Sequence, residues 1–326
     1  MPDLKNKTGI SSTRRHFLKR SAQILASLGL SQTLSPFSLF GQIQHAGKMP
    51  TRPLGKTGHH VTLFSLGGEG ILRTYGRKDA AVKVIHKALD LGVNYCDTAP
   101  AYAESQDYYG EVLASRRKEV FQTSKTHERT RDGSLQLLDD SLRRLRTDYL
   151  DLWQLHDLRT KEDLDEIFGK DGALEALEEA KRQKMVRFTG ITGHHDPEIL
   201  LEAMRRYPFD TVLCAVNAAD KHALSFIDTV IPKALEQNMG IIAMKVLSRG
   251  QIFRRGGIET PEQAISYVLS LPVSTALIGC STPEEVIQNV EIAKQFRSLA
   301  PEIMKEMERI TAPYAPEACF FKAVRP

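Results

Sequence analysis

Three short stretches of the sequence end in polar or ionisable side chains: Asn-Tyr-Cys-Asp-Thr-Ala (residues 94–99), Phe-Gln-Thr-Ser-Lys-Thr (121–126) and Leu-Trp-Gln-Leu-His-Asp (152–157). We predict that each forms a buried β-strand that stops at a hydrogen-bonding group. All strands of a parallel barrel direct their carboxyl ends to the same rim, which is where barrel proteins place their chemistry. If the three strands are neighbours, their ionisable side chains meet there.

The alternation of strand-like runs and amphipathic segments repeats eight times between residues 61 and 296. Eight such units in series, over roughly 240 residues, favour an α/β fold of the (β/α)8 TIM-barrel type over a doubly wound sheet. No G-x-G-x-x-G motif follows the first strand, and residues 67–70 are predicted to be a glycine-rich turn, so a Rossmann-type nucleotide site is unsupported. The predicted strands are 61–66, 93–97, 120–124, 150–155, 186–191, 211–216, 240–244 and 275–278. The predicted helices are 79–91, 104–115, 132–146, 172–184, 196–206, 224–238, 260–270 and 283–296.

The first forty residues resemble a twin-arginine (Tat) export signal. Ser-Thr-Arg-Arg-His-Phe-Leu-Lys (12–19) carries the arginine pair, and a modestly apolar stretch follows at about 22–40. That stretch is too polar for a comfortable membrane span, so no stable span is expected after processing. A basic cytosolic tail is the alternative. The sequence thus predicts periplasmic export through the Tat machinery, and three parts: a signal segment with linker (1–46), the barrel (47–312) and a tail (313–326).

Charge and cysteine content argue against two other classes of protein. The formal net charge is +4, part of it lies in the first twenty residues, and no nucleic-acid partner is implied. The four cysteines lie far apart and lack Cys-x-x-Cys spacing, so they are predicted to be reduced core thiols. His194, His195 and Asp196 resemble a metal cluster, but adjacent histidines on a strand point to opposite faces. No metal is therefore predicted.

Four residues at the predicted rim form a proton-donating set: Asp97, Tyr102, Lys125 and His156. When hydride reduces a carbonyl group, the oxygen becomes an alkoxide and needs a proton, and Tyr102 is the predicted acid. Its pKa, near 10 in a free tyrosine, is expected to be lowered by the Lys125 ammonium, which Asp97 keeps charged and oriented. A neutral His156 is expected to donate to the carbonyl oxygen and fix its angle.

These motifs resemble those of the aldo/keto reductase family. The string at 94–99 followed by Tyr102, then Ser-Lys-Thr (124–126), then the strand that ends at His156, carry the likeness, which extends from about residue 51 to 296. The segment 52–58 is similar to the family's leading hairpin. The resemblance implies that the four rim residues are the family's catalytic set. It also implies NADP or NAD as cofactor and a small carbonyl or alcohol, such as an aldehyde, ketone or sugar, as substrate.

The resemblance places the nicotinamide amide after the fifth strand, where the family commonly has a Ser-Asn pair. Here Thr192 can supply the hydroxyl, Gly193 cannot supply an amide, and His194 is predicted to take its place.

At the end of the seventh strand the family's aromatic residue and Ser-Pro-Leu are replaced by Met-Lys-Val-Leu, ending at Leu247. Met244 is predicted to lie against the nicotinamide ring as a polarizable surface, and Lys245 to reach the pyrophosphate. Asn217, at the end of strand six, matches a family asparagine, whereas Leu213 stands where glutamine is usual.

The last phosphate-binding segment of the family corresponds to residues 279–289, which begin at Gly279. Ser281 and Glu285 occupy places where the family has arginine or lysine for the adenosine 2′-phosphate. A carboxylate there disfavours that phosphate and suits a ribose hydroxyl, so both NADP and NAD remain open. Asn289 matches a family asparagine near the adenine.

Two alternatives to a reductase remain at this stage. One is a nucleotide-binding sensor or regulatory barrel with little turnover, and the other is a cofactor-independent barrel hydrolase or isomerase, which fold alone does not exclude. A monomer or a small homo-oligomer is expected. The tail from residue 313 has two open placements, over the mouth of the barrel or below it.

Overall fold

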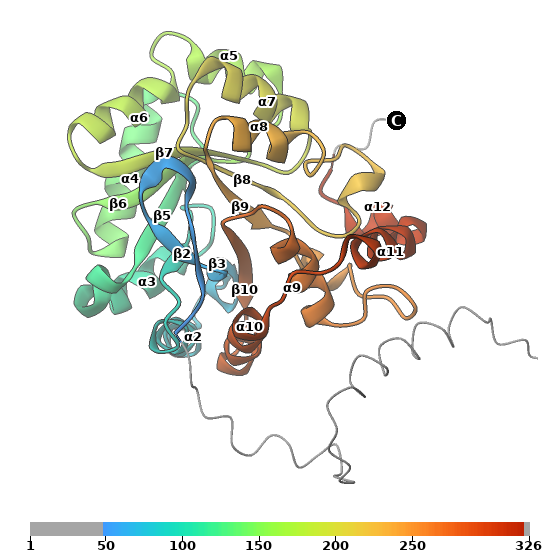
Figure 1. Ribbon diagram of the computed structural model, residues 1–326. Coiled ribbons are helices and arrows are strands. Elements are labelled where there is room, and N and C mark those ends of the chain that lie inside the picture. The colour runs from blue at the N-terminus through green and yellow to red at the C-terminus, as the bar shows by residue number, and fades with distance from the viewer. Residues whose placement is uncertain (1–47, 323–326) are drawn as a thin grey trace, which may run out of the picture. The chain divides into compact units, whose positions relative to one another are not determined.

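The protein, described by a computed structural model over residues 48–322, is built on a closed barrel of parallel strands (Figure 1). The order around the barrel is β10-β3-β4-β5-β6-β7-β8-β9. This confirms the predicted (β/α)8 TIM barrel, whereas the predicted export segment lies outside the described residues. The strands are β3 (Phe64–Gly70), β4 (Tyr95–Asp97), β5 (Phe121–Thr126), β6 (Leu150–Leu155), β7 (Val186–Gly193), β8 (Thr211–Ala215), β9 (Gly240–Met244) and β10 (Thr275–Cys280).

Helices surround the barrel on the outside (Figure 1). Within residues 48–322 no helix is both long and apolar enough to cross a membrane. The helices are α2 (Lys78–Asp90), α3 (Ser105–Arg116), α4 (Arg131–Leu145), α5 (Lys161–Phe168), α6 (Ala173–Arg182), α7 (Pro197–Arg206), α8 (Val230–Glu236), α9 (Pro261–Ser270), α10 (Pro283–Gln295), α11 (Pro301–Thr311) and α12 (Ala315–Ala318).

An antiparallel hairpin of β1 (Thr51–Pro53) and β2 (His60–Thr62) closes the amino-terminal end of the barrel. Leu54, between its strands, is fully buried and packs with the side chains inside the barrel. Arg52 fastens the hairpin to the end of α9, because its guanidinium donates to the carbonyl of Leu269 at 2.7 Å. One end of the barrel is therefore plugged, and the carboxyl rim is the end left for a site.

Side chains of alternate residues fill the barrel interior. Tyr95, Phe121 and Leu152 belong to this inner cluster, and the pairing sets Tyr95 opposite Phe121. Because successive side chains of a strand alternate between its two faces, residues two and four positions further along these strands also face inward, now at the rim. Those positions hold Asp97, Lys125 and, just beyond β6, His156.

The first predicted strand was wrong in its bounds. Val61 lies in the hairpin strand β2, and the barrel strand β3 begins only at Phe64. Residues 67–70 are the end of β3 and not a turn. Glycine is needed here because a Cβ at Gly279 would lie 2.7 Å from the Glu69 carbonyl carbon, so β3 and β10 approach each other more closely than side chains allow.

Helix prediction failed at three segments and one boundary. α5, α11 and α12 were not expected, and the helix predicted for 224–238 begins only at Val230. Pro232 explains the late start, because proline is accommodated in the first turn of a helix but disrupts its interior.

The C-terminal segment packs at the carboxyl rim rather than below the barrel. The Ser248 hydroxyl, after β9, donates to the carbonyl of Ala318. Lys322 Nζ reaches the Asp220 carboxylate at 2.6 Å, in the segment after β8. The tail thus contacts the two segments of the rim that carry several predicted cofactor residues.

Candidate active site

A buried ion pair between Lys125 and Asp97 lies at the carboxyl rim. Lys125 Nζ is 2.7 and 2.6 Å from the two carboxylate oxygens and 2.8 Å from the carbonyl oxygen of Thr98, so each N–H has an acceptor. The Thr123 hydroxyl adds a bond to Asp97 at 2.7 Å. Burial lowers the pKa of Lys125 and Asp97 opposes this shift. A carboxylate at this distance holds the lysine in its charged form.

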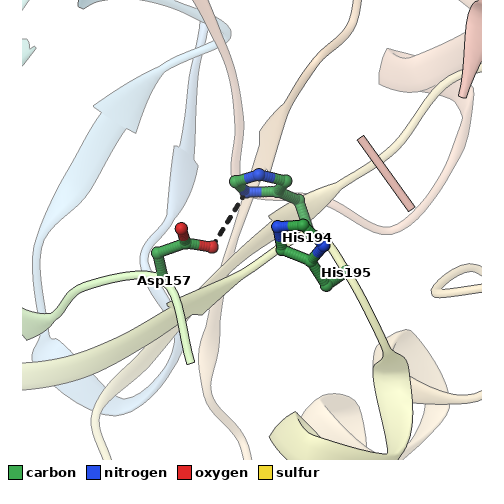
Figure 2. Close-up of side chains that lie close together, drawn as sticks. All are labelled: Asp157, His194 and His195. Carbon is green, nitrogen blue, oxygen red and sulfur yellow. Dashed lines mark ion pairs between the residues drawn. The ribbon is translucent and has the colours of Figure 1, made fainter. Parts of the chain in front are cut away.

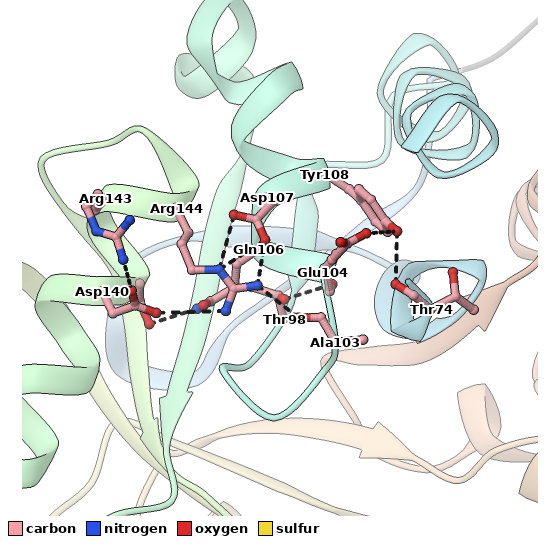
Figure 3. Close-up of polar contacts among 12 residues, drawn as sticks. Thr74, Thr98, Ala103, Glu104, Gln106, Asp107, Tyr108, Asp140, Arg143 and Arg144 are labelled. Carbon is pink, nitrogen blue, oxygen red and sulfur yellow. Dashed lines mark hydrogen bonds and ion pairs between the residues drawn. The ribbon is translucent and has the colours of Figure 1, made fainter. Parts of the chain in front are cut away.

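Tyr102 lies in the turn between β4 and α3, which Figure 3 shows to be held by α4. Arg144 of α4 donates to the carbonyl of Ala103 at 2.8 Å, and Asp107 fixes Arg144 at 2.6 Å. Ala103 has a left-handed backbone (φ 48°), a strained state for alanine that this contact supports. On the other side the Tyr102 ring lies against bare backbone, because a Cβ at Gly68 would be 2.6 Å from ring atom Cδ2.

The Tyr102 hydroxyl faces His156. Its oxygen is 3.5 Å from His156 Nε2, and the two rings meet nearly at right angles. Burial, followed by the nearby charge of Lys125, holds the pKa of His156 well below its usual range, so the imidazole is neutral at pH 7. Lys125 Nζ lies 4.9 Å from the centroid of the Tyr102 ring. The structure therefore brings all four predicted side chains together.

The expected lowering of the Tyr102 pKa is wrong for this structure. Burial raises the pKa of Tyr102 well above its ordinary value, with Asp97 and Glu69 adding to the shift and Arg73 opposing it. Lys125 does not reverse this shift, because the opposite charge of Asp97 lies 2.6 Å from its Nζ and weakens its effect on the ring. The phenol consequently remains protonated at neutral pH, the form that an acid needs.

The end of β7 and the residue that follows it place Thr192 and His194 around Asp157. Thr192 Oγ1 accepts from the Asp157 backbone N–H at 2.7 Å, and His194 Nδ1 lies 3.4 Å from Asp157 Oδ1. Burial is the main cause that lowers the pKa of His194 to about 4. A neutral imidazole with its proton on Nδ1 towards Asp157 keeps Nε2 as an acceptor, which suits the amide N–H of a carboxamide. A side chain at Gly193 would instead meet Leu200 of α7, at 3.0 Å.

Asp157, His194 and His195 each place one potential ligand atom within 4.8 Å of the others (Figure 2). The prediction that the two histidines point to opposite faces is wrong: their ring centroids are 4.8 Å apart, because β7 ends before them and strand alternation stops there. Asp196 is not part of the group and caps α7. Arg159 donates to Asp157 Oδ2 at 2.6 Å, and this positive charge opposes a metal ion, so we assign none.

The loop after β9 is held by Asn217, which lies just after β8. Asn217 is buried, its Oδ1 accepts from the Ala219 N–H at 2.9 Å, and its Nδ2 donates to the Lys245 carbonyl at 3.3 Å. Its amide therefore helps to hold the loop, and within residues 48–322 its second N–H has no acceptor. Met244 is half-buried against the inner cluster, and Leu247 packs against the outer core between barrel and helices. Of the predicted residues here, Asn217, Met244 and Lys245 lie at, or within two residues beyond, the carboxyl ends of their strands.

Lys245 belongs to a charged group that sequence analysis missed. Glu69, at the end of β3, binds Arg73 at 2.8 Å and Arg249 at 3.1 Å. The charges of Lys245, Arg249 and Arg73 together outweigh burial and lower the pKa of Glu69. Loops of this kind carry no periodic signal, so nothing in the sequence indicated that residues 180 positions apart would meet. Asp157 was also missed, although it directly follows His156.

The start of α10 carries the predicted adenosine-side residues. The Ser281 N–H donates to Glu285 Oε2 at 2.6 Å, and the Thr282 hydroxyl accepts from the Glu285 N–H at 3.3 Å. Glu285 thus occupies an N–H group next to the helix N-terminus, a position that often serves to bind anions. Asn289 is buried, and its Nδ2 lies 3.4 Å from the Cys280 sulfur. Gly279 leaves the adjacent strand end without a side chain.

A barrel whose rim holds a protonated tyrosine, a neutral histidine and a buried lysine–aspartate pair belongs to the class of proteins equipped for proton transfer to a substrate oxygen. Residues 63–260 match the sequence model of the Aldo/keto reductase family. The chain belongs to that family.

Relatives share most of their length with this chain. It is 26% identical over 318 residues to L-galactose dehydrogenase of Arabidopsis thaliana, covering 82% of this chain and 95% of that protein. It is 25% identical over 323 residues to a putative voltage-gated potassium channel subunit beta of Schizosaccharomyces pombe, covering 80% of this chain and 93% of that protein. The holo form of an aldo-keto reductase from Bacillus halodurans matches with a TM-score of 0.68 at 25% identity, covering 80% of this chain and 96% of that one.

Proposed function

We propose that the protein is an NAD(P)-dependent aldo/keto reductase that transfers hydride between a nicotinamide and a small carbonyl compound or alcohol. In the reductive direction hydride adds to the carbonyl carbon, the carbonyl π electrons move to oxygen, and that oxygen takes the Tyr102 proton. The phenolate then regains a proton from solvent. In the oxidative direction the same group acts as the base.

The observation that carries the proposal is the position of Tyr102 between His156 and the buried ion pair. A substrate oxygen beside the Tyr102 hydroxyl is also within reach of His156, whose neutral Nε2–H tautomer would donate a second hydrogen bond. Two donors aimed at one oxygen stabilise the charge that develops on it. Lys125, 4.9 Å from the ring centroid, stabilises the phenolate that proton transfer creates.

The rim also fits a nicotinamide nucleotide, which supplies the hydride when bound. Thr192 and His194 would hold the carboxamide, and Lys245 would contact the pyrophosphate. These assignments rest on donor and acceptor chemistry and on the family resemblance.

The adenosine side of the proposal leaves NADP and NAD open. Glu285, bound to the Ser281 N–H, places a carboxylate where a 2′-phosphate would add two negative charges. A ribose hydroxyl would instead donate to it. Comparing NADH with NADPH in one assay is therefore part of the test.

The function is tested with the purified full-length chain. Binding is measured by fluorescence titration with NADH and NADPH, and turnover by nicotinamide absorbance over a panel of aldehydes, ketones and sugars in both directions. We expect binding of at least one nucleotide and reduction of several aldehydes. Binding without turnover of any compound would favour the sensor alternative, which the similarity to a channel subunit supports. Absence of nucleotide binding would favour a hydrolase or isomerase.

We also propose that the N-terminal segment is a Tat signal that directs the folded protein to the periplasm. The proposal is supported by the order of features along the chain: the arginine pair Arg14 and Arg15 comes first, the apolar stretch follows, and the folded domain comes last. Export of a folded chain would allow a cytoplasmic nucleotide to travel with it. Arg14→Lys together with Arg15→Lys should retain the protein in the cytoplasmic fraction. An unchanged periplasmic fraction would overturn this assignment.

A further inference from the structure

Arg73 is a second positive charge on the ring of Tyr102. It ends the short 3₁₀ turn after β3 (Ile71–Arg73), and its guanidinium carbon lies 5.2 Å from the Tyr102 ring centroid. Lys125, on the same ring, is fully buried and has all three N–H groups bonded. The Arg73 side chain is 40% exposed. Of these two cations, Arg73 is the one that a substrate can reach.

The Arg73 guanidinium has unused hydrogen-bonding capacity. Within residues 48–322 its one hydrogen-bond acceptor is Glu69 Oε1, at 2.8 Å from Nη1. Arginine carries five N–H donors in a planar fork, and this geometry matches a carboxylate with two parallel hydrogen bonds. Most of the N–H groups of the Arg73 guanidinium are therefore available to a ligand beside Tyr102, the proposed proton donor.

The loop that carries Arg73 is fixed to the loop that carries Tyr102. The Tyr108 hydroxyl lies 2.9 Å from the Thr74 carbonyl oxygen and 2.7 Å from Glu104 Oε2, as Figure 3 shows. Glu104 also accepts from the Gly76 N–H at 2.7 Å. Glu104 and Tyr108 lie two and six residues after Tyr102 in the chain. The spacing between these two loops is thus set by the fold.

The local charge favours an anion. Glu69 is the one carboxylate shared by Arg73 and Arg249, and Lys245 lies close enough to lower its pKa further. Within this group three cations face one carboxylate, so the group itself carries an excess of positive charge. Lys245 and Arg249 come from the loop after β9, where the nucleotide is proposed to lie. Arg73 comes from the loop after β3 and is the cation in contact with the acid.

We propose that Arg73 binds a carboxylate of the substrate, so that the preferred substrates are carbonyl compounds bearing a carboxylate, such as oxo acids or uronates. This inference rests on the proposed reductase function. The carboxylate would lie on the Arg73 fork while the carbonyl oxygen faces Tyr102 and His156, which requires a few bonds between the two groups. The substrate carboxylate would also neutralise Arg73, whose positive charge favours the Tyr102 phenolate. An anionic substrate would therefore help to keep Tyr102 protonated.

The test compares pairs of substrates that differ in the carboxylate: succinic semialdehyde with butanal, and glucuronate with glucose. For the wild type we expect kcat/KM to be higher for the anionic member by about 10- to 100-fold, the range of a hydrogen bond to a charged group. Arg73→Met should reduce this ratio to near one, mainly through KM for the anionic substrate. Arg73→Lys, which keeps the charge and loses the fork, should give an intermediate ratio.

Arg249→Met is the matched control, because Arg249 shares the Glu69 partner but does not lie on the Tyr102 ring. It should retain the wild-type ratio. Thermal unfolding of each variant shows that the fold is intact. A wild-type ratio near one, with butanal still reduced, would overturn the inference while leaving the reductase function in place. So would an unchanged ratio in Arg73→Met. Failure to reduce any carbonyl would instead overturn the function.

Glyceraldehyde 3-phosphate, compared with glyceraldehyde, tests the choice of anion. A phosphate preference larger than the carboxylate preference, lost in Arg73→Met, would contradict the assignment to a carboxylate.

Discussion

Two buried lysine–aspartate pairs in this protein are nearly identical in geometry. Lys125 and Lys322 each place Nζ 2.6 Å from an aspartate oxygen, and each side chain is at most 5% exposed. Each ammonium has three oxygen acceptors, at 2.6–2.8 Å for Lys125 and 2.6–2.7 Å for Lys322. Lys125 binds both oxygens of its aspartate and one carbonyl, whereas Lys322 binds one aspartate oxygen and two carbonyls. The difference that bears on chemistry is in the aromatic ring beside each. Lys125 lies over Tyr102 at 4.9 Å, and Lys322 over Phe226 at 5.6 Å.

This difference shows that a buried ion pair does not by itself identify a catalytic site. Burying two charges costs desolvation energy that their attraction roughly offsets, so such a pair can serve structure as well as chemistry. The Lys125–Asp97 pair lies beside the phenol of Tyr102, which can give up a proton. The second pair fastens the C-terminal tail, whose Phe321 ring lies 5.9 Å from the His194 ring.

Replacing Lys125 by methionine should have the largest effect. Asp97 would remain buried without its cation, which costs about 3–5 kcal/mol in the free energy of unfolding. The phenolate of Tyr102 would lose its stabilising charge, and carbonyl reduction is expected to fall by about 10²–10⁴-fold, the range of general acid catalysis. Steady-state kinetics and urea unfolding measure the two effects. A folded Lys125→Met protein with wild-type kcat would show that this pair is structural only.

Lys322→Met makes the matched change in the second pair. The cost in unfolding free energy should be of similar size, about 3–5 kcal/mol, since Asp220 is left buried and unpaired. With saturating nucleotide, kcat should stay close to that of the wild type, because no atom of this pair touches the acid. Urea unfolding and saturation kinetics separate the two quantities. A loss of kcat as large as that in Lys125→Met would remove the distinction between the pairs.

Lowering the pH should reduce the stability of the folded protein through His194, in the candidate active site. The pKa of His194 is lowered to about 4 in the folded state, and that of unfolded histidine is near 6.5. The folded state therefore favours the neutral form, and this stability is present above pH 6.5 and lost as the pH falls towards 4. At pH 5 one such histidine costs about 2 kcal/mol. Urea unfolding should be easier at pH 5 than at pH 7, and less so in His194→Asn. Equal stability at both pH values would contradict the buried neutral state.

Phe321→Ala should have the smallest effect. It removes the ring that packs against His194, a contact worth about 0.5–1.5 kcal/mol, so the nucleotide Kd is expected to rise by about 2- to 10-fold with little change in kcat. Phe320, which is 45% exposed, provides the control variant Phe320→Ala. If both variants bind nucleotide equally well, the tail does not support His194.

The barrel and the meeting of Asp97, Lys125 and His156 could be predicted because both follow from local rules. Eight repeated units define the barrel, and strand alternation sends residues at fixed spacing to one rim. The bounds of the first strand were predicted wrongly because the apolar run 61–66 continues from the hairpin strand β2 into the barrel strand β3 without a change in composition. The chain changes element there because of packing that the sequence does not display.

The remaining parts of the site depend on contacts between distant segments. Arg144 fixes the Tyr102 turn from 41 residues away in the chain, and Arg73 meets the tyrosine ring only after the barrel closes. The pKa of Tyr102 was predicted in the wrong direction because the sequence names a lysine neighbour but does not reveal burial. His194 and His195 converge because β7 stops just before them. Such endings are set by tertiary contacts rather than by periodicity.

The most direct test of the account is the single-turnover rate of carbonyl reduction by Tyr102→Phe, followed by nicotinamide absorbance with nucleotide binding measured in parallel. We expect nucleotide affinity to be retained and the rate to fall by about 10²–10⁴-fold, because the ring remains and only the proton donor is removed. An unchanged rate with intact binding would contradict the role of Tyr102 as the acid, since the proton would then come from another group.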